Sequence, residues 1–228
     1  MTSPRPLALV TGASRGIGAA VAAALAPTHD LLLGGRDAAA LGAVAEGLGA
    51  RALPWPVDLT DAGALAGATE RIDELDVLVH SAGVGVLGTV EELDAETWRR
   101  QFEVNVVAVA ELTRLLLPAL RAARGTVVCV NSGAGLAARP GWGAYAASKF
   151  ALRAFADSLR GEEPTLRVCS VHPGRVDTDM QRSVVAYEGG AYDPDRYLRP
   201  ESVAAAVLAA VTASPDAHIA EIVVRPTG

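Results

Sequence analysis

The sequence is poor in the residues on which several classes of protein depend. Only 4% of its 228 residues are aromatic, and it has two cysteines, Cys129 and Cys169. Both cysteines lie inside apolar runs, as buried structural cysteines do, so the sequence indicates neither a disulfide-stabilised secreted protein nor a cysteine nucleophile. No apolar run approaches the length of a membrane span, and residues 1–6 lack the apolar core of a signal peptide. We therefore expect a soluble protein of the cytoplasm.

Positive charge is also scarce. The chain has 26 acidic and 20 basic residues, which gives a formal net charge of −6. Such a chain has no overall positive field that would attract nucleic acid or an anionic membrane. We expect neither of these as a partner, and no bound metal, which leaves small molecules.

Lysine is almost absent. Of the 20 basic residues 19 are arginine, and Lys149 is the only lysine. Codon drift explains arginine wherever either cation suffices. The lysine that remains indicates a position that needs a compact ammonium with a shiftable pKa.

Apolar runs alternate with amphipathic or alanine-rich stretches along the whole chain. The expected strands cover residues 7–10, 30–33, 52–57, 75–79, 125–130, 166–171 and 219–224, and the expected helices cover 16–26, 37–48, 61–71, 94–122, 143–162 and 200–213. The strands are continuously apolar, which is typical of parallel strands buried on both faces. The pattern predicts one α/β domain over residues 1–228, a doubly wound (Rossmann) parallel sheet of about seven strands with helices on both faces.

Two long connections interrupt this rhythm, at residues 83–93 and 177–199. The second is too long for an ordinary connector, so we expect a substrate lid there. Its residues Met180, Tyr187 and Tyr192, together with Trp142, predict an apolar or aromatic pocket, with no cluster that demands a phosphate or carboxylate.

A glycine-rich turn, Gly12-Ala13-Ser14-Arg15-Gly16-Ile17-Gly18, joins the first strand to the first helix. Glycines there permit a tight turn, a close approach of the backbone to pyrophosphate, and a helix N-terminus aimed at the anion. Any strand-to-helix turn can use glycine, but this position favours a dinucleotide site with Ser14, Arg15 and Ile17 in the cradle. The P-loop signature is missing, which disfavours an NTPase.

The second strand ends in glycine followed by Arg36, where NAD binders usually carry an acidic residue. Arginine suits a 2′-phosphate, and Arg15 favours the same ligand, so we predict NADP(H) rather than NAD(H). Asp37 competes as the N-cap of the next helix. Asp58, followed by Leu59 after the third strand, is a candidate contact for adenine, with a turn or capping carboxylate as its structural alternative.

Tyr145 and Lys149 are four residues apart on an expected helix, which places them on one face, one turn apart. A tyrosine with a pKa of about 10 is a poor acid–base catalyst at neutral pH, and a neighbouring ammonium favours its phenolate. Ser132 follows the fifth strand, at the edge where such sheets bind ligands, and its hydroxyl could polarise a carbonyl. An isolated pair could equally be an interfacial tyrosine and an exposed lysine.

Asn105 interrupts a strongly apolar helical stretch, although asparagine is a poor helix former and costly to bury unpaired. A hydrogen bond in the core and a position in a water relay beside Lys149 are the two interpretations.

Together these motifs, in this order, resemble the short-chain dehydrogenase/reductase family. The resemblance extends to His172-Pro173-Gly174-Arg175-Val176-Asp177-Thr178. It implies that Tyr145 is the general acid/base, that Lys149 lowers its pKa and binds ribose, that Ser132 orients substrate, and that Asn105 anchors a water. It also implies that the cofactor contacts Ala82, Gly83, Pro173, Gly174, Val176 and Thr178, and that the helices at 94–118 and 143–160 pair subunits into a homodimer or homotetramer.

The chain departs from the family pattern at His80-Ser81, where the family carries two asparagines, and at its C-terminus, which lacks Asp-Gly-Gly. The first departure questions some hydrogen bonds at the sheet edge, and His80 is interpreted as structural. We expect an NADP(H)-dependent oxidoreductase for a carbonyl or secondary alcohol. The alternatives are a redox sensor without turnover and a nucleotide-sugar epimerase, although the latter needs a larger substrate domain.

Overall fold

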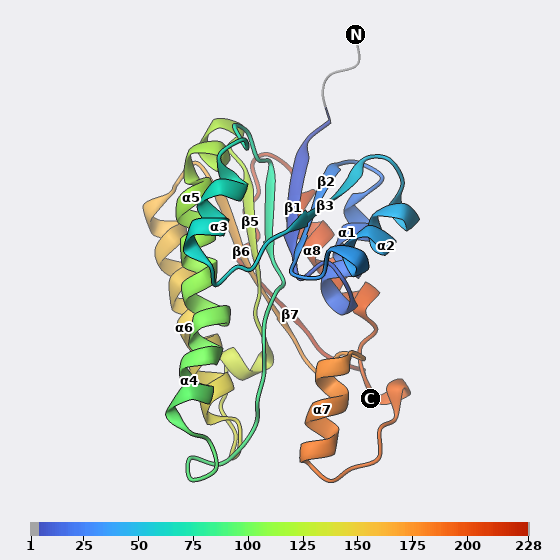
Figure 1. Ribbon diagram of the computed structural model, residues 1–228, viewed down its shortest axis with the longest axis vertical. Coiled ribbons are helices and arrows are strands. Elements are labelled where there is room, and N and C mark those ends of the chain that lie inside the picture. Colours follow the sequence, from blue (N-terminus) through green and yellow to red (C-terminus); the bar gives the residue numbers. More distant parts are fainter. Residues whose placement is uncertain (1–4, 228) are drawn as a thin grey trace.

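The computed structural model describes residues 5–227 and consists of one parallel sheet with helices on both faces (Figure 1). The strands are β1 (Leu7–Thr11), β2 (Asp30–Gly35), β3 (Ala52–Pro56), β4 (Val77–His80), β5 (Thr126–Val130), β6 (Arg167–Pro173) and β7 (Glu221–Val224). Their order is β3-β2-β1-β4-β5-β6-β7. The chain reverses its direction of growth between β1 and β4, so the ends of these two strands form the switch point where such sheets bind ligands. The predicted doubly wound sheet of seven strands is confirmed.

The helices form two layers. The first comprises α1 (Gly16–Leu25), α2 (Ala38–Leu48) and α8 (Pro200–Val211), and the second comprises α3 (Ala62–Thr69), α4 (Ala95–Phe102), α5 (Ala108–Ala123) and α6 (Gly143–Glu162). Figure 1 shows these layers on opposite sides of the sheet, with α7 (Asp179–Tyr187) beyond the C-terminal ends of the strands. No helix within residues 5–227 is long and apolar enough to cross a membrane.

Strands β1 to β6 supply both cores, because successive side chains point to opposite faces, whereas β7 packs on one side only. Ala8 and Val10 pack with α1, α2 and α8, whereas Leu9 packs with α5 and α6. The two cysteines divide in the same way, and both are buried and free: Cys129 belongs to the α5–α6 core and Cys169 to the α1–α8 core. They therefore fill space on opposite sides of the sheet.

Two expected segments differ from the structure. The connection at 177–199 contains helix α7 and a 3₁₀ turn, Pro194–Arg196, because Thr178 caps the helix and Val184 and Val185 bury its inner face. The helix expected over 94–122 is divided into α4 and α5 by a π-helical turn, Glu103–Val107. Such turns occur often at functional sites, and this one carries Asn105.

Candidate active site

The glycine turn adopts a backbone that other residues would strain. Gly12 has φ +67°, and a Cβ there would lie 2.8 Å from the backbone N of Ala82. A Cβ on Gly18 would overlap the carbonyl oxygen of Gly12. The turn, the start of α1 and the Ala82–Gly83 segment after β4 are therefore pressed together, which leaves a backbone-lined cradle at the N-terminus of α1 that fits a pyrophosphate.

Thr11, which the sequence analysis did not select, locks this cradle. Its hydroxyl accepts hydrogen bonds from the backbone N–H groups of Ser81 and Ala82, both at 3.1 Å. His80 Nε2 lies 2.9 Å from the Thr113 hydroxyl, and burial lowers the pKa of His80 to about 3. These contacts supply order at the edge where the family's two asparagines are missing, and they give His80 a structural role. A hydroxyl at the end of a strand, just before Gly12, is the signal that could have indicated Thr11.

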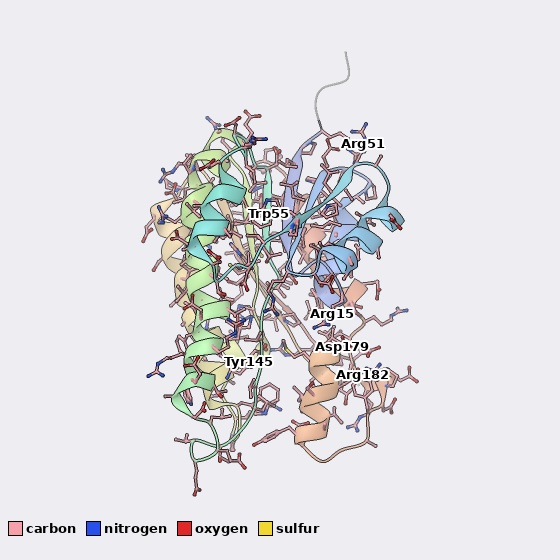
Figure 2. All side chains as sticks on the ribbon, viewed as in Figure 1. Arg15, Arg51, Trp55, Tyr145, Asp179 and Arg182 are labelled. Carbon is pink, nitrogen blue, oxygen red and sulfur yellow. The ribbon has the colours of Figure 1, made fainter. Side chains whose placement is uncertain are left out.

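The two arginines predicted to bind the 2′-phosphate have different surroundings. Arg36 is exposed at the end of β2. Arg15 is also exposed, and its Nε lies 3.5 Å from Oδ2 of Asp179 at the start of α7 (Figure 2). Thr178, one residue earlier, packs its methyl group against Gly16, since a Cβ on Gly16 would lie 3.4 Å from it. Helix α7 therefore begins directly on the glycine turn.

The aspartates that follow β2 and β3 make structural hydrogen bonds. Asp37 caps α2 through the N–H of Ala40 at 3.0 Å. Asp58 Oδ1 accepts from both the N–H and the hydroxyl of Thr60, and these bonds lower the pKa of the Asp58 carboxyl. Leu59 packs, partly buried, against the core. The structure thus shows the turn role for Asp58, and its contact with adenine stays a prediction.

Ser132, Tyr145 and Lys149 come together at the C-terminal edge of the sheet. Ser132 follows β5 and lines the same cavity as Tyr145. Lys149 is buried, its Nζ donates to the Val130 carbonyl at 3.1 Å, and it lies 5.9 Å from the centroid of the Tyr145 ring. The three predicted catalytic side chains are therefore neighbours, brought from β5 and α6.

Burial shifts the pKa values of Tyr145 and Lys149 in opposite directions. Burial raises the pKa of Tyr145, and the neighbouring Ser132 side chain opposes that rise. Burial lowers the pKa of Lys149 to about 8. Ser132 is thus the neighbour that opposes the effect of burial on the phenol, and the ammonium of Lys149 is directed at the Val130 carbonyl. The predicted effect of Lys149 on the pKa of Tyr145 stays a prediction.

Asn131 holds these residues in place and was missed by sequence reasoning. Its side chain donates to the Lys149 carbonyl at 3.1 Å and accepts from the Ser132 N–H at 2.8 Å. A buried amide just before a candidate catalytic serine is the signal that could have indicated it. It joins the end of β5 to the middle of α6.

Asn105 is fully buried in the π-helical turn. It exchanges two hydrogen bonds of 2.9 Å with the backbone of Val84, and its second N–H donates to Ser148 Oγ at 3.0 Å. Both N–H groups are used, so the structure shows the hydrogen bond in the core. The water-relay role stays a prediction that would need other atoms of the turn.

A cavity of about 490 Å³ opens in front of Ser132 and Tyr145. Its wall includes the predicted cofactor contacts Ile17, Pro173, Gly174, Val176 and Thr178. From the lid it takes Met180, and Trp142 meets Tyr145 edge-on with ring centroids 6.0 Å apart. Tyr187 and Tyr192 do not line it: Tyr187 lies against Gly141, and Tyr192 hydrogen-bonds to Asp177 under the guanidinium of Arg182.

The same wall corrects the expectation of an uncharged pocket. It carries four arginines: Arg139, Arg175, Arg196 and Arg225. They come from the loop before α6, the segment after β6, the connection at 177–199 and the residue after β7, so no local pattern could have grouped them.

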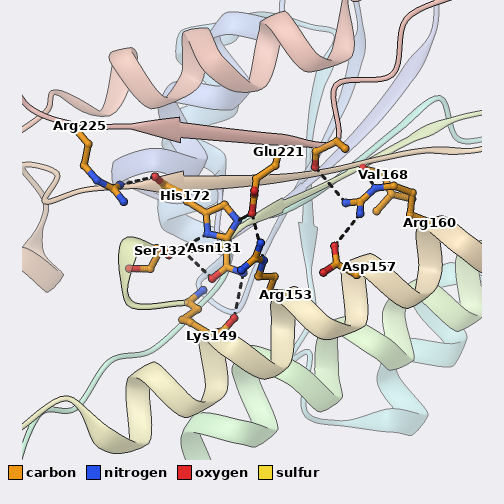
Figure 3. Close-up of polar contacts among 11 residues, drawn as sticks. Asn131, Ser132, Lys149, Arg153, Asp157, Arg160, Val168, His172, Glu221 and Arg225 are labelled. Carbon is orange, nitrogen blue, oxygen red and sulfur yellow. Dashed lines mark hydrogen bonds and ion pairs between the residues drawn. The ribbon is translucent and has the colours of Figure 1, made fainter. Parts of the chain in front are cut away.

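A polar network behind Ser132 ties three strands and α6 together (Figure 3). Nδ1 of the buried His172 lies 3.1 Å from the Ser132 carbonyl, to which it can donate, and Nε2 lies 2.9 Å from Glu221 Oε1, although without hydrogen-bond geometry. Glu221 also pairs with Arg153 of α6 at 3.3 Å. Burial lowers the pKa of His172. The network fixes the backbone that carries Ser132. Nowhere in residues 5–227 do three or more His, Cys, Asp or Glu gather as a metal site.

Comparison with known proteins identifies the same architecture. The profile of the family described as short chain dehydrogenase matches residues 6–189. The trans-4-hydroxycyclohexanecarboxylate dehydrogenase of Sinomonas cyclohexanicum is 36% identical over 76% of this chain and 73% of its own length. The glycine betaine reductase ATRR of Emericella nidulans is 34% identical over 96% of this chain, which spans only 18% of that protein.

Solved structures agree. The alcohol dehydrogenase of the archaeon Thermococcus sibiricus, complexed with 5-hydroxy-NADP, superposes with a TM-score of 0.89 at 30% identity and covers 97% of each chain. Other similar structures contain NADP or NADPH.

Proposed function

Because this chain belongs to the short-chain dehydrogenase/reductase family, we propose that it is an NADP(H)-preferring oxidoreductase acting on a carbonyl or secondary alcohol, with Tyr145 as its general acid/base. The observation that carries the proposal is the meeting of Ser132 and Tyr145 in one cavity with the buried ammonium of Lys149 behind them. NADP(H), when bound, supplies or accepts the hydride. The glycine cradle, the N-terminus of α1 and the exposed Arg36 are the groups that would hold it.

The chain's own residues move the proton. In reduction, Ser132 donates a hydrogen bond to the substrate carbonyl and orients it toward the phenol. Tyr145 donates its proton to the oxygen as negative charge develops there, and takes one from the alcohol in the reverse direction. Lys149, whose pKa burial lowers to about 8, stabilises the phenolate that remains. The apolar side chains of Trp142 and Met180 in the cavity wall limit access of water.

The decisive test is the substitution Tyr145→Phe. It keeps the ring and its packing but removes the proton donor, so turnover should fall by about 10²–10⁴-fold while the affinity for NADPH barely changes. The measurement is NADPH oxidation with a panel of aldehydes and ketones, in which cyclic ketones come first because the Sinomonas relative is named for a cyclic alcohol. Near-parental turnover would show that another group transfers the proton.

Lys149→Arg provides the companion variant. It keeps the positive charge but replaces a compact ammonium by a larger planar group in a buried site. We expect losses in both turnover and cofactor affinity. If the parent binds NADPH tightly yet oxidises it with no substrate in the panel, the redox-sensor alternative replaces the enzyme.

A further inference from the structure

The wall of the candidate active-site cavity is unusually positive for this chain. It carries four arginines and, among the described residues that line it, no Asp or Glu. The protein as a whole has the opposite balance, with a net charge of −6. The positive wall is thus a local feature, and it surrounds Ser132 and Tyr145.

Arg225 lies beside the proposed chemistry. Its Nη1 donates to the carbonyls of His172 at 2.9 Å and Val224 at 3.2 Å, which fixes the guanidinium (Figure 3). A Cβ on Gly133 would lie 3.3–3.4 Å from Nη2, Cζ and Nη1 alike. The guanidinium therefore lies face-on over Gly133, the residue next to Ser132.

Hydrogen-bonding capacity is left over at this position. Nε and Nη2 of Arg225 make no hydrogen bond within the described chain, and no carboxylate there lies within 4.0 Å of the guanidinium. Arg175, by contrast, already pairs with Glu188. Gln181, buried in the same wall, has an Nε2 without a partner among residues 5–227. Arg225 and Gln181 thus offer donors that no acceptor in the described chain satisfies.

We propose that Arg225 binds a carboxylate of the substrate, so that the enzyme interconverts an oxo acid and the corresponding hydroxy acid; this rests on the proposed function of the same cavity. A guanidinium edge binds a carboxylate through two parallel hydrogen bonds. The guanidinium lies over Gly133, and the Cα atoms of Gly133 and Ser132 are about 3.8 Å apart. A substrate whose carbonyl is held by Ser132 would therefore reach Arg225 with a carboxylate only a few bonds from that carbonyl. Hydride reaches the carbonyl carbon, the Tyr145 proton reaches its oxygen, and the carboxylate is unchanged.

The test compares each acid with its neutral amide. Pyruvate, acetoacetate and levulinate, and the three matching amides, are assayed with NADPH in the parent, in Arg225→Gln and in Arg225→Lys. We expect kcat/KM to favour at least one acid over its amide by tenfold or more in the parent. That ratio should fall at least tenfold in Arg225→Gln. It should fall by less in Arg225→Lys, which keeps the charge but loses the paired N–H donors of the guanidinium.

Arg51→Gln is the matched control, because it removes the same charge at the opposite end of the molecule from Tyr145 (Figure 2). Its acid-to-amide ratio should equal that of the parent. A parent that turns over amides as well as acids, or an acid preference that survives in Arg225→Gln, overturns the proposal.

A direct binding measurement separates this proposal from the proposed function. Levulinate is titrated into the parent–NADP complex and into the Arg225→Gln complex by calorimetry. Tighter binding to the parent without turnover of any compound would support the carboxylate site and refute the reductase. Turnover of neutral ketones, with equal binding of levulinate to the parent and to Arg225→Gln, would support the reductase and refute the carboxylate site.

Discussion

At the scale of single residues, His80 makes the stability depend on pH. It is buried against Thr113, and burial lowers its pKa from 6.5 to about 3. The unfolded chain therefore binds a proton at a pH where the folded chain does not. The stabilisation is complete above pH 6.5 and is lost progressively as the pH falls toward 3. At pH 5 the parent should have lost about 2 kcal/mol of unfolding free energy relative to a non-titrating variant.

Urea unfolding of the parent and of His80→Asn between pH 7 and pH 5 measures this difference. Asparagine is the residue that the family carries there, and it has no titrating group. If the free energy of unfolding depends on pH in the same way in both proteins, His80 is hydrated or protonated in the folded state. The other buried histidines are present in both proteins, so their contributions to the pH dependence cancel in the difference.

At the same scale, we predict that Arg36 determines the choice of cofactor. If its exposed guanidinium meets the 2′-phosphate, NADPH should bind at least tenfold tighter than NADH, about 1.4 kcal/mol. Arg36→Asp should reverse the order, because the carboxylate repels the phosphate. Fluorescence titration with both cofactors gives the two dissociation constants. Equal constants in the parent would contradict the assignment of Arg36.

At the scale of elements, we predict that helix α7 competes with the cofactor for Arg15, because Asp179 at its start pairs with that side chain. The Arg15–Asp179 pair is exposed, with side chains 78% and 68% accessible, so it stabilises the fold by at most about 1 kcal/mol. Asp179→Asn should hardly change the melting temperature. It frees Arg15 for the 2′-phosphate, so the Kd for NADPH should fall by up to about fivefold.

Asp195→Asn, which removes the same charge from the 3₁₀ turn of the lid, is the control for this effect. Both variants are compared by NADPH titration at low and high salt, since screening weakens exposed pairs. An unchanged Kd in Asp179→Asn, or an equal change in Asp195→Asn, would exclude a switch of Arg15 between the lid and the cofactor.

At the scale of the whole molecule, we predict assembly into a homodimer or homotetramer through α5 and α6. Phe150 on α6 is 43% exposed and Val107, just before α5, is 50% exposed. The small-residue stripe Ala147, Ala151, Ala154 and Ser158 is half-buried to exposed on α6, which permits close helix packing. Light scattering at micromolar concentration should give a multiple of 23.4 kDa.

Phe150→Glu combined with Val107→Glu should yield the monomer mass, because each protomer would desolvate two charges at the interface. Val90→Glu, at an 81% exposed valine outside these helices, should leave the mass unchanged. A monomeric parent refutes the prediction directly.

The sequence by itself determined what is encoded locally. Continuous apolar strands alternating with amphipathic helices require a two-sided parallel sheet, and the glycines at 12, 16 and 18 require the phosphate turn. Tyr145 and Lys149 share a helix face because they are four residues apart. The helix α7 escaped this reasoning because its short apolar face, Val184 and Val185, lies in a segment rich in glycine and tyrosine.

Only the tertiary structure decided which distant side chains meet. Arg225 lies over Gly133 because β7, β6 and β5 are adjacent in the sheet, although these residues are far apart in the chain. The same adjacency directs His172 at the Ser132 carbonyl, and α6 packing joins Asn131 to Lys149. Each contact depends on the order of the strands in the sheet, which local sequence spacing does not determine. The positive charge of the cavity wall therefore could not be predicted from the sequence.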